Sequence, residues 1–102
     1  LGNNQENASF PAALCAEGVA VFHAGATYPG VAIKAIAISA SSKNHLVDTP
    51  VAPCGICRQS ISEYEMRQKS PIKLVMMGEK GEVFKCHSVA DILPLSFDSA
   101  FL

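Results

Sequence analysis

Two short cysteine-containing segments constrain the fold of this chain more than any other feature. They are Cys15-Ala16-Glu17 and Pro53–Cys57, which reads Pro-Cys-Gly-Ile-Cys. Three sulfur ligands leave the fourth position of a tetrahedral zinc ion open, and an open position can hold a water molecule. The Glu17 carboxylate lies two residues from the first thiolate, so it is placed to move a proton of that water. The pattern predicts a hydrolytic site that forms only if the two segments meet.

Both segments stand at the expected starts of helices. The spacing of apolar residues predicts one helix over 14–26 and a second over 54–67, which follows a proline suited to its first turn. A helix N-terminus stabilises thiolates through its dipole and its free backbone N–H groups. Cys54 and Cys57 are one turn apart, so both sulfurs can reach the same metal ion, and Cys15 completes the triangle from the first helix.

The rest of the chain alternates between strands and helices. Three strands are expected, at 31–40, 71–77 and 82–87. The first is nearly apolar on both faces, which is typical of a buried strand. The strand–helix–strand order implies a parallel pair with a right-handed crossover, and a tight turn at 78–81 returns the third strand antiparallel. A short helix over 88–93 is expected, with Ser88 as its N-cap. The pattern predicts one α/β domain with a mixed β-sheet, spanning residues 1–102.

Composition excludes two classes of partner. The net charge is −1 and no basic run is present, whereas a nucleic-acid partner normally requires a clustered Lys/Arg surface. The longest apolar stretches are far shorter than a membrane span. The Cys-x-x-Cys spacing and the absence of a visible signal peptide favour reduced, metal-binding thiols over disulfides, and hence a cytoplasmic location. Because Leu1 is not an initiator methionine, we expect that an N-terminal segment precedes it.

Size and hydrophobicity favour self-association. A chain of 102 residues buries a smaller fraction of its surface than a larger one and often depends on a metal or on partner subunits. Here 49 % of the residues are hydrophobic, and the chain ends in apolar side chains that need cover, namely Phe97, Ala100, Phe101 and Leu102. We therefore expect a homo-oligomer.

Other interpretations of the same residues stay open. Cys86 could add a fourth sulfur and close a structural Cys₄ site. That site would leave Glu17 without a role, and a mid-strand cysteine is more often a small core residue. Glu17 could also be an ordinary exposed carboxylate. The three histidines lack ligand spacing to the cysteine segments and are interpreted as surface or packing residues; they are His23, His45 and His87.

Four segments, taken in order, resemble those of the small, homotetrameric, three-cysteine cytidine deaminases. They are residues 4–11 (Asn-x-Glu-Asn-Ala-Ser-Phe-Pro), 15–17 (Cys-Ala-Glu), 53–59 (Pro-Cys-Gly-x-Cys-Arg-Gln) and 93–97 (Leu-Pro-Leu-Ser-Phe). The resemblance covers nearly the whole chain. It implies a three-layer α/β/α sandwich, a homotetramer, and one zinc ion per subunit held by Cys15, Cys54 and Cys57.

The resemblance also implies an activity. Family members hydrolyse cytidine or deoxycytidine to uridine or deoxyuridine in pyrimidine salvage, and Glu17 matches the residue that moves protons to N3 and to the leaving ammonia. Five further positions match family contacts to a free pyrimidine nucleoside: Asn4 and Glu6 to the ribose hydroxyls, the Ala16 N–H to the base carbonyl, the Ala52 carbonyl to the amino group, and Phe97 to the base, often from a neighbouring subunit.

The chain departs from the family pattern at three places. Family members begin with a helix and a β-hairpin that are missing ahead of Asn4. Gly18 stands where the family usually has an arginine that donates to the zinc-bound sulfurs, so the metal should be less Lewis acidic here. Arg58 could compensate only if its side chain turned inward. Phe10 replaces a usual tyrosine. These departures predict weaker catalysis or a changed substrate.

Three other functions follow as alternatives. One is deamination of another aminopyrimidine nucleoside such as blasticidin S. Another is a catalytically weak, zinc-stabilised oligomeric homologue. The third, a nucleic-acid editor, is disfavoured because such deaminases typically insert a helix where this chain has the tight turn at 78–81.

Overall fold

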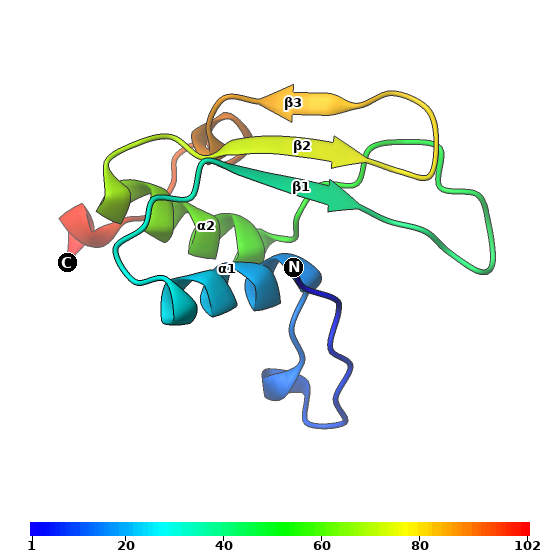
Figure 1. Ribbon diagram of the computed structural model, residues 1–102, viewed down its shortest axis with the longest axis horizontal. Coiled ribbons are helices and arrows are strands. Elements are labelled where there is room, and N and C mark those ends of the chain that lie inside the picture. Colours follow the sequence, from blue (N-terminus) through cyan, green and yellow to red (C-terminus); the bar gives the residue numbers. More distant parts are fainter.

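A computed structural model describes all 102 residues, Leu1–Leu102. Two α-helices pack against one three-stranded sheet (Figure 1). The regular elements in chain order are α1 (Ala16–Thr27), β1 (Ala35–Ser39), α2 (Gly55–Gln68), β2 (Lys73–Met77) and β3 (Phe84–Cys86). Three short 3₁₀ helices accompany them: η1 (Phe10–Ala12), η2 (Val89–Ile92) and η3 (Ser99–Phe101).

The sheet has the predicted mixed topology, in the order β1-β2-β3. β1 and β2 are parallel, with Ile36 opposite Leu74, and β2 and β3 are antiparallel, with Leu74 opposite Cys86. The crossover between the parallel strands is α2, as the strand–helix–strand pattern predicted. Gly81 in the β2–β3 turn has a φ of 96°, a conformation that favours glycine. The α/β class and the mixed sheet are therefore confirmed.

Both α-helices lie side by side on one face of the sheet (Figure 1). The core between them and the sheet contains seven buried apolar side chains, from Val21, Ile38, Ile61, Ile72, Leu74, Met76 and Val89. Both helices begin at the end of the sheet where β1 and β2 finish (Figure 1). In open α/β sheets this end is the usual place for a ligand site, and here it brings the two cysteine segments together.

The first strand is shorter than predicted. Residues 31–34 precede the strand, and the Gln68 side chain binds the backbone of one of them, Ile33. The Ile33 N–H donates to Gln68 Oε1 at 2.9 Å, and Gln68 Nε2 donates to the Ile33 carbonyl at 2.8 Å. Only one face of β1 is covered: Ile38 is buried, whereas Ala35 and Ala37 are exposed. The prediction that this strand is buried on both faces is wrong for the residues described.

The β2–β3 turn supports the long loop that leads to the second cysteine segment. The Glu79 N–H donates to the Val47 carbonyl at 2.7 Å, and Glu79 Oε1 accepts the Ser42 N–H at 3.2 Å. A Cβ on Gly78 would lie only 2.5 Å from the Val47 oxygen, so this close approach requires glycine. The turn thus holds the loop against the sheet. No helix of the chain combines the length and the apolar character needed to cross a membrane.

Candidate functional site

The two helix N-termini bring three cysteine sulfurs together. Cys15 is the N-cap of α1, Cys54 is the N-cap of α2, and Cys57 lies in the first turn of α2. The three sulfurs lie within 4.8 Å of one another, with 3.5 Å between those of Cys15 and Cys54. Tetrahedral zinc, with Zn–S bonds of about 2.3 Å, separates its sulfurs by about 3.8 Å. The cluster therefore has the donors and the spacing to hold a zinc ion with three sulfur ligands.

The electrostatic environment of the cluster differs from one sulfur to the next. The backbone N–H of Cys57, in the first turn of α2, lowers the pKa of the Cys54 thiol. Burial raises the pKa of the Cys57 thiol, whose residue is only 4 % exposed. The hydrogen bond to Cys54 raises the pKa of Cys15. Three thiolates this close repel one another, so a divalent cation is the natural partner that allows all three to ionise.

Cys86 takes no part in the cluster. It lies on β3, partly buried, and packs against the core. The only group of metal-ligating side chains with convergent donor atoms is formed by Cys15, Cys54 and Cys57, so no histidine joins it. The interpretation of Cys86 as a small core residue, outside a three-sulfur site, is confirmed.

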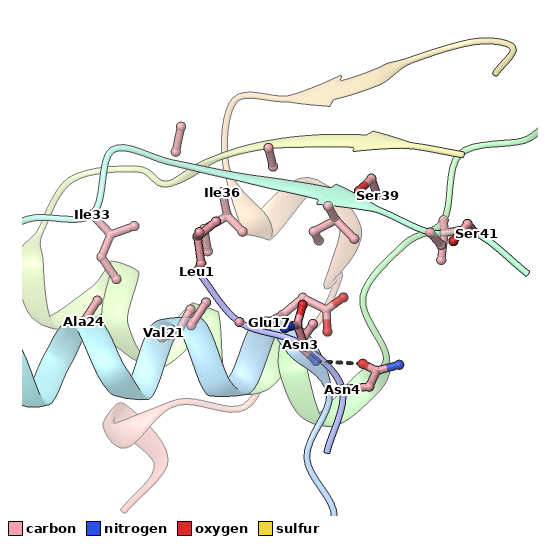
Figure 2. Close-up of a pocket in the computed structure, with 18 residues that line it drawn as sticks. Leu1, Asn3, Asn4, Glu17, Val21, Ala24, Ile33, Ile36, Ser39 and Ser41 are labelled. Atoms are coloured by element: carbon pink, nitrogen blue, oxygen red, sulfur yellow. Dashed lines mark hydrogen bonds between the residues drawn. The ribbon is translucent and has the colours of Figure 1, made fainter. Parts of the chain in front are cut away.

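A cavity of about 750 Å³ opens between α1 and β1; none of the three cysteines lines it, but Ala16 and Glu17, which directly follow Cys15, do. Most of its lining is apolar and comes from α1 and β1, while Asn3, Asn4 and Glu17 supply polar groups at one end (Figure 2). Glu17 is half-buried in the first turn of α1, two residues after the Cys15 ligand position. A carboxylate is favourable at a helix N-terminus. The structure therefore places the predicted proton carrier in a cavity wall.

Asn4 is brought to the same end of the cavity by hydrogen bonds between two neighbouring backbone segments. Gln5 and Leu14 form an isolated antiparallel bridge, with N–H to oxygen distances of 2.8 and 3.1 Å. The bridge lays Asn4 against the start of α1, where its Oδ1 accepts the Ala16 N–H at 2.8 Å. The two residues expected to contact different parts of a nucleoside thus contact each other. In this structure the N–H assigned to the base carbonyl already has an acceptor.

Three expected contact residues lie outside the cavity lining. Glu6 is exposed, and Val51 lines the cavity in place of its neighbour Ala52. Phe97 is 54 % exposed, stacks on Phe101 with 5.7 Å between ring centroids, and its carbonyl accepts a hydrogen bond from Gln59 on α2. The roles of these residues in substrate binding stay predictions.

Gly18 has room for a Cβ atom beside a sulfur. The residue is buried, and a Cβ built on it would lie 3.9 Å from Cys57 Sγ and 3.7 Å from the Phe22 ring, which are ordinary contacts. The position can therefore accept a side chain at its base. Arg58 does not turn inward to replace the expected guanidinium: it donates to the carbonyls of Pro53 and Ile92, at 2.8 and 2.9 Å.

Sequence reasoning missed the residues that hold α2 in place. The Glu65 carboxylate accepts the Ile72 N–H at 2.7 Å, the Ser88 hydroxyl at 2.7 Å and the Val89 N–H at 3.3 Å. These bonds tie α2 to the segment before β2 and to the start of η2. A glutamate flanked by apolar residues of the second helix was the only signal available, and it does not reveal the partners.

Fold and site together define a zinc-binding α/β domain with a three-thiolate centre and a mostly apolar cavity whose wall includes the Glu17 carboxylate. Residues 1–71 match the family model of the cytidine and deoxycytidylate deaminase zinc-binding region. The chain belongs to this family.

Individual relatives agree with that assignment. The chain is 36 % identical over 97 residues to a cytidine deaminase of Sporosarcina psychrophila, with 94 % of this chain and 63 % of that protein covered. It is 33 % identical over 99 residues to a cytidine deaminase of Mycoplasma pneumoniae, with coverage of 96 % and 68 %. A crystal structure of cytidine deaminase from Burkholderia pseudomallei superposes with a TM-score of 0.73 at 35 % identity, covering 94 % of this chain and 69 % of that one. The chain thus spans about two thirds of the length of these relatives.

Proposed function

We propose that the protein deaminates free cytidine or deoxycytidine by zinc-dependent hydrolysis, with one zinc ion per subunit. The observation that carries this proposal is the position of Glu17 in the cavity wall, two residues after Cys15 of the three-sulfur cluster. The names of the relatives support the choice of substrate. In the reaction a water oxygen bonds to C4 of the base, the C4–N bond breaks, and uridine or deoxyuridine and ammonia leave.

The sulfurs of Cys15, Cys54 and Cys57 would hold the zinc ion, which would supply the Lewis acidity that makes a water molecule nucleophilic at neutral pH. Three thiolates give this centre a net charge of about −1, so a nearby base is needed more than on a site rich in histidine.

Glu17 provides that base. Its carboxylate accepts a proton from the attacking water and delivers it to N3 of the base, and later transfers a proton to the departing amino group. Its place in the first turn of α1 fixes it on the element that begins with Cys15. A shift of α1 would therefore move ligand and base together.

The remaining contacts follow from the family resemblance. Asn4 and Glu6 bind ribose hydroxyls, and the Ala52 carbonyl and the Ala16 N–H orient the base, the N–H after it exchanges Asn4 Oδ1 for the base carbonyl. Phe97 reaches the base of a neighbouring subunit. The exposed stack of Phe97 on Phe101 supports that last assignment, since the ring is available on the surface. Amide, carboxylate and backbone groups suit hydroxyl and base-edge partners.

The exposure of apolar side chains near the C-terminus also supports a homotetramer. The C-terminal segment carries Leu95, Phe97, Phe101 and Leu102, each with more than half of its surface exposed. Burial of such side chains between subunits removes apolar area from water at about 25 cal/mol per Å². We place the tetramer in the cytoplasm, in pyrimidine salvage. Sedimentation at micromolar concentration tests the assembly, and a monomeric profile contradicts it.

The substrate is tested by ultraviolet absorbance. The zinc-loaded protein is given cytidine, deoxycytidine and blasticidin S in turn, and loss of absorbance at the aminopyrimidine band is followed. Turnover of the first two supports the proposal, whereas turnover of blasticidin S alone supports the other nucleoside deaminase. Gly18 favours one second candidate, a catalytically weak zinc-stabilised homologue, and inactivity on all three compounds would establish it.

A further inference from the structure

Helix α1 lacks a cap of its own. Its N-cap residue, Cys15, makes no side-chain hydrogen bond to the first turn. The first N–H groups of a helix have no intrahelical partners, and a cap oxygen normally satisfies one of them. Here the Cys15 side chain points to the other two sulfurs instead. A helix that carries both a metal ligand and Glu17 therefore depends on another residue for this contact.

Asn4 supplies the contact from outside the helix. Its Oδ1 accepts the Ala16 N–H at 2.8 Å, and the paired backbone bonds between Gln5 and Leu14 hold it there. Figure 2 shows the bond beside the Glu17 side chain. We propose that Asn4 is a positioning residue that caps α1 in place of Cys15, and so fixes the turn that carries the Cys15 sulfur and the Glu17 carboxylate.

The importance of this contact for catalysis rests on the proposed function, but its test does not depend on activity. The proposal gives the two polar atoms of the Asn4 side chain different roles. The Oδ1 atom is engaged by Ala16, which leaves the Nδ2 group as the donor available to a ligand in the cavity. Replacement by aspartate keeps an acceptor for the Ala16 N–H and removes the amide donor, whereas replacement by leucine keeps similar bulk and removes both.

The test compares zinc-loaded wild type, Asn4→Asp and Asn4→Leu in two measurements. The first is hydrogen exchange of the Ala16 amide by NMR, with the Glu17 amide as an internal reference. The second is the rate of zinc release to a chromogenic chelator. We expect Asn4→Leu to speed both about fivefold, and Asn4→Asp to restore both to within about twofold of wild type, because loss of a cap costs about 1 kcal/mol.

Equal exchange in all three proteins overturns the proposal, and so does an Asn4→Asp protein that behaves like Asn4→Leu. If Asn4→Leu does not fold, the wild type still decides: an Ala16 amide that exchanges as fast as the Glu17 amide contradicts the capping role. Neither measurement uses turnover, so a protein inactive on cytidine would refute the proposed function and leave this result intact.

Discussion

The Arg58 Nε donates to the Pro53 carbonyl at 2.8 Å, so the residue directly after one metal-ligand position holds the residue directly before another. Its Nη1 also donates to the Ile92 carbonyl at 2.9 Å, which joins this turn to η2. The guanidinium is thus a clamp on the Pro53–Cys57 segment. Its geometry makes Arg58 a contributor to metal binding without any contact to the sulfurs.

Replacement of Arg58 by alanine should therefore weaken zinc binding. We expect the dissociation constant to rise about tenfold, as is typical when an outer partner of a metal site is lost. Competition with a zinc chelator measures it. Arg67→Ala is the matched control, because Arg67 lies on the same helix but is exposed, and its contacts, an ion pair with Glu63 and a stack over the Tyr64 ring, involve no residue of the Pro53–Cys57 segment. Similar zinc affinity in the two variants would disprove the clamp.

Replacing single cysteines by serine should distinguish the cysteines that bind zinc from Cys86, which does not. Cys57→Ser should lose most of its bound zinc on dialysis, because a hydroxyl is a far poorer ligand for zinc than a thiolate. Cys86→Ser should retain one zinc per subunit, since Cys86 lies outside the cluster. Metal analysis by mass spectrometry gives both values. Zinc loss in Cys86→Ser and retention in Cys57→Ser would reverse the assignment.

The space beside Gly18 predicts a gain of function. In Gly18→Arg a guanidinium can donate to the sulfurs, withdraw charge from them and make the metal more Lewis acidic. We expect kcat on cytidine to rise severalfold. Gly18→Ala is the control, because it stabilises the helix by up to about 1 kcal/mol without adding charge. If Gly18→Arg is no faster than Gly18→Ala, the idea that this glycine weakens the site is wrong.

Glu65 should matter for stability and not for chemistry. It accepts hydrogen bonds from three donors, of which the Ile72 and Val89 amides belong to fully buried residues. Glu65→Gln turns an acceptor into a donor that faces these groups, and we expect the free energy of unfolding to fall by about 2 kcal/mol. Urea denaturation of the zinc-loaded protein measures this. Glu63→Gln, which breaks only an exposed ion pair, should cost less than about 0.5 kcal/mol.

Much of this structure follows from local sequence. The βαβ unit, the antiparallel return and the meeting of the cysteine segments could be predicted because each depends on short-range patterning and on helix start signals. The paired hydrogen bonds between Ile33 and Gln68, at the end of α2, could not be predicted, because the two residues are far apart in the sequence. Side chains that bind distant backbone leave no periodic signal, which is why the backbone partners of Arg58 and Glu65 could not be predicted.

In the candidate site, too, some features could be predicted from the sequence and others could not. Cys15, Cys54 and Cys57 converge as their motifs predicted, since two helix N-termini at one end of a sheet bring them together. Glu17 lies in the first turn after Cys15 and lines the cavity. The bond between Asn4 and Ala16 could not be foreseen, because it depends on the isolated bridge between Gln5 and Leu14. A motif can name the residues of a site, but only the packed structure shows which of them bind one another.

The central claim is that Glu17 moves the proton in a zinc-dependent deamination. Its most direct test is the turnover of cytidine by zinc-loaded wild type and by Glu17→Gln, with zinc content measured on the same samples. We expect one zinc per subunit in both proteins and a rate at least about 100-fold lower in the variant, the typical contribution of a general acid–base group. Equal rates at equal zinc content, or a zinc-loaded wild type that leaves cytidine unchanged, would contradict the account.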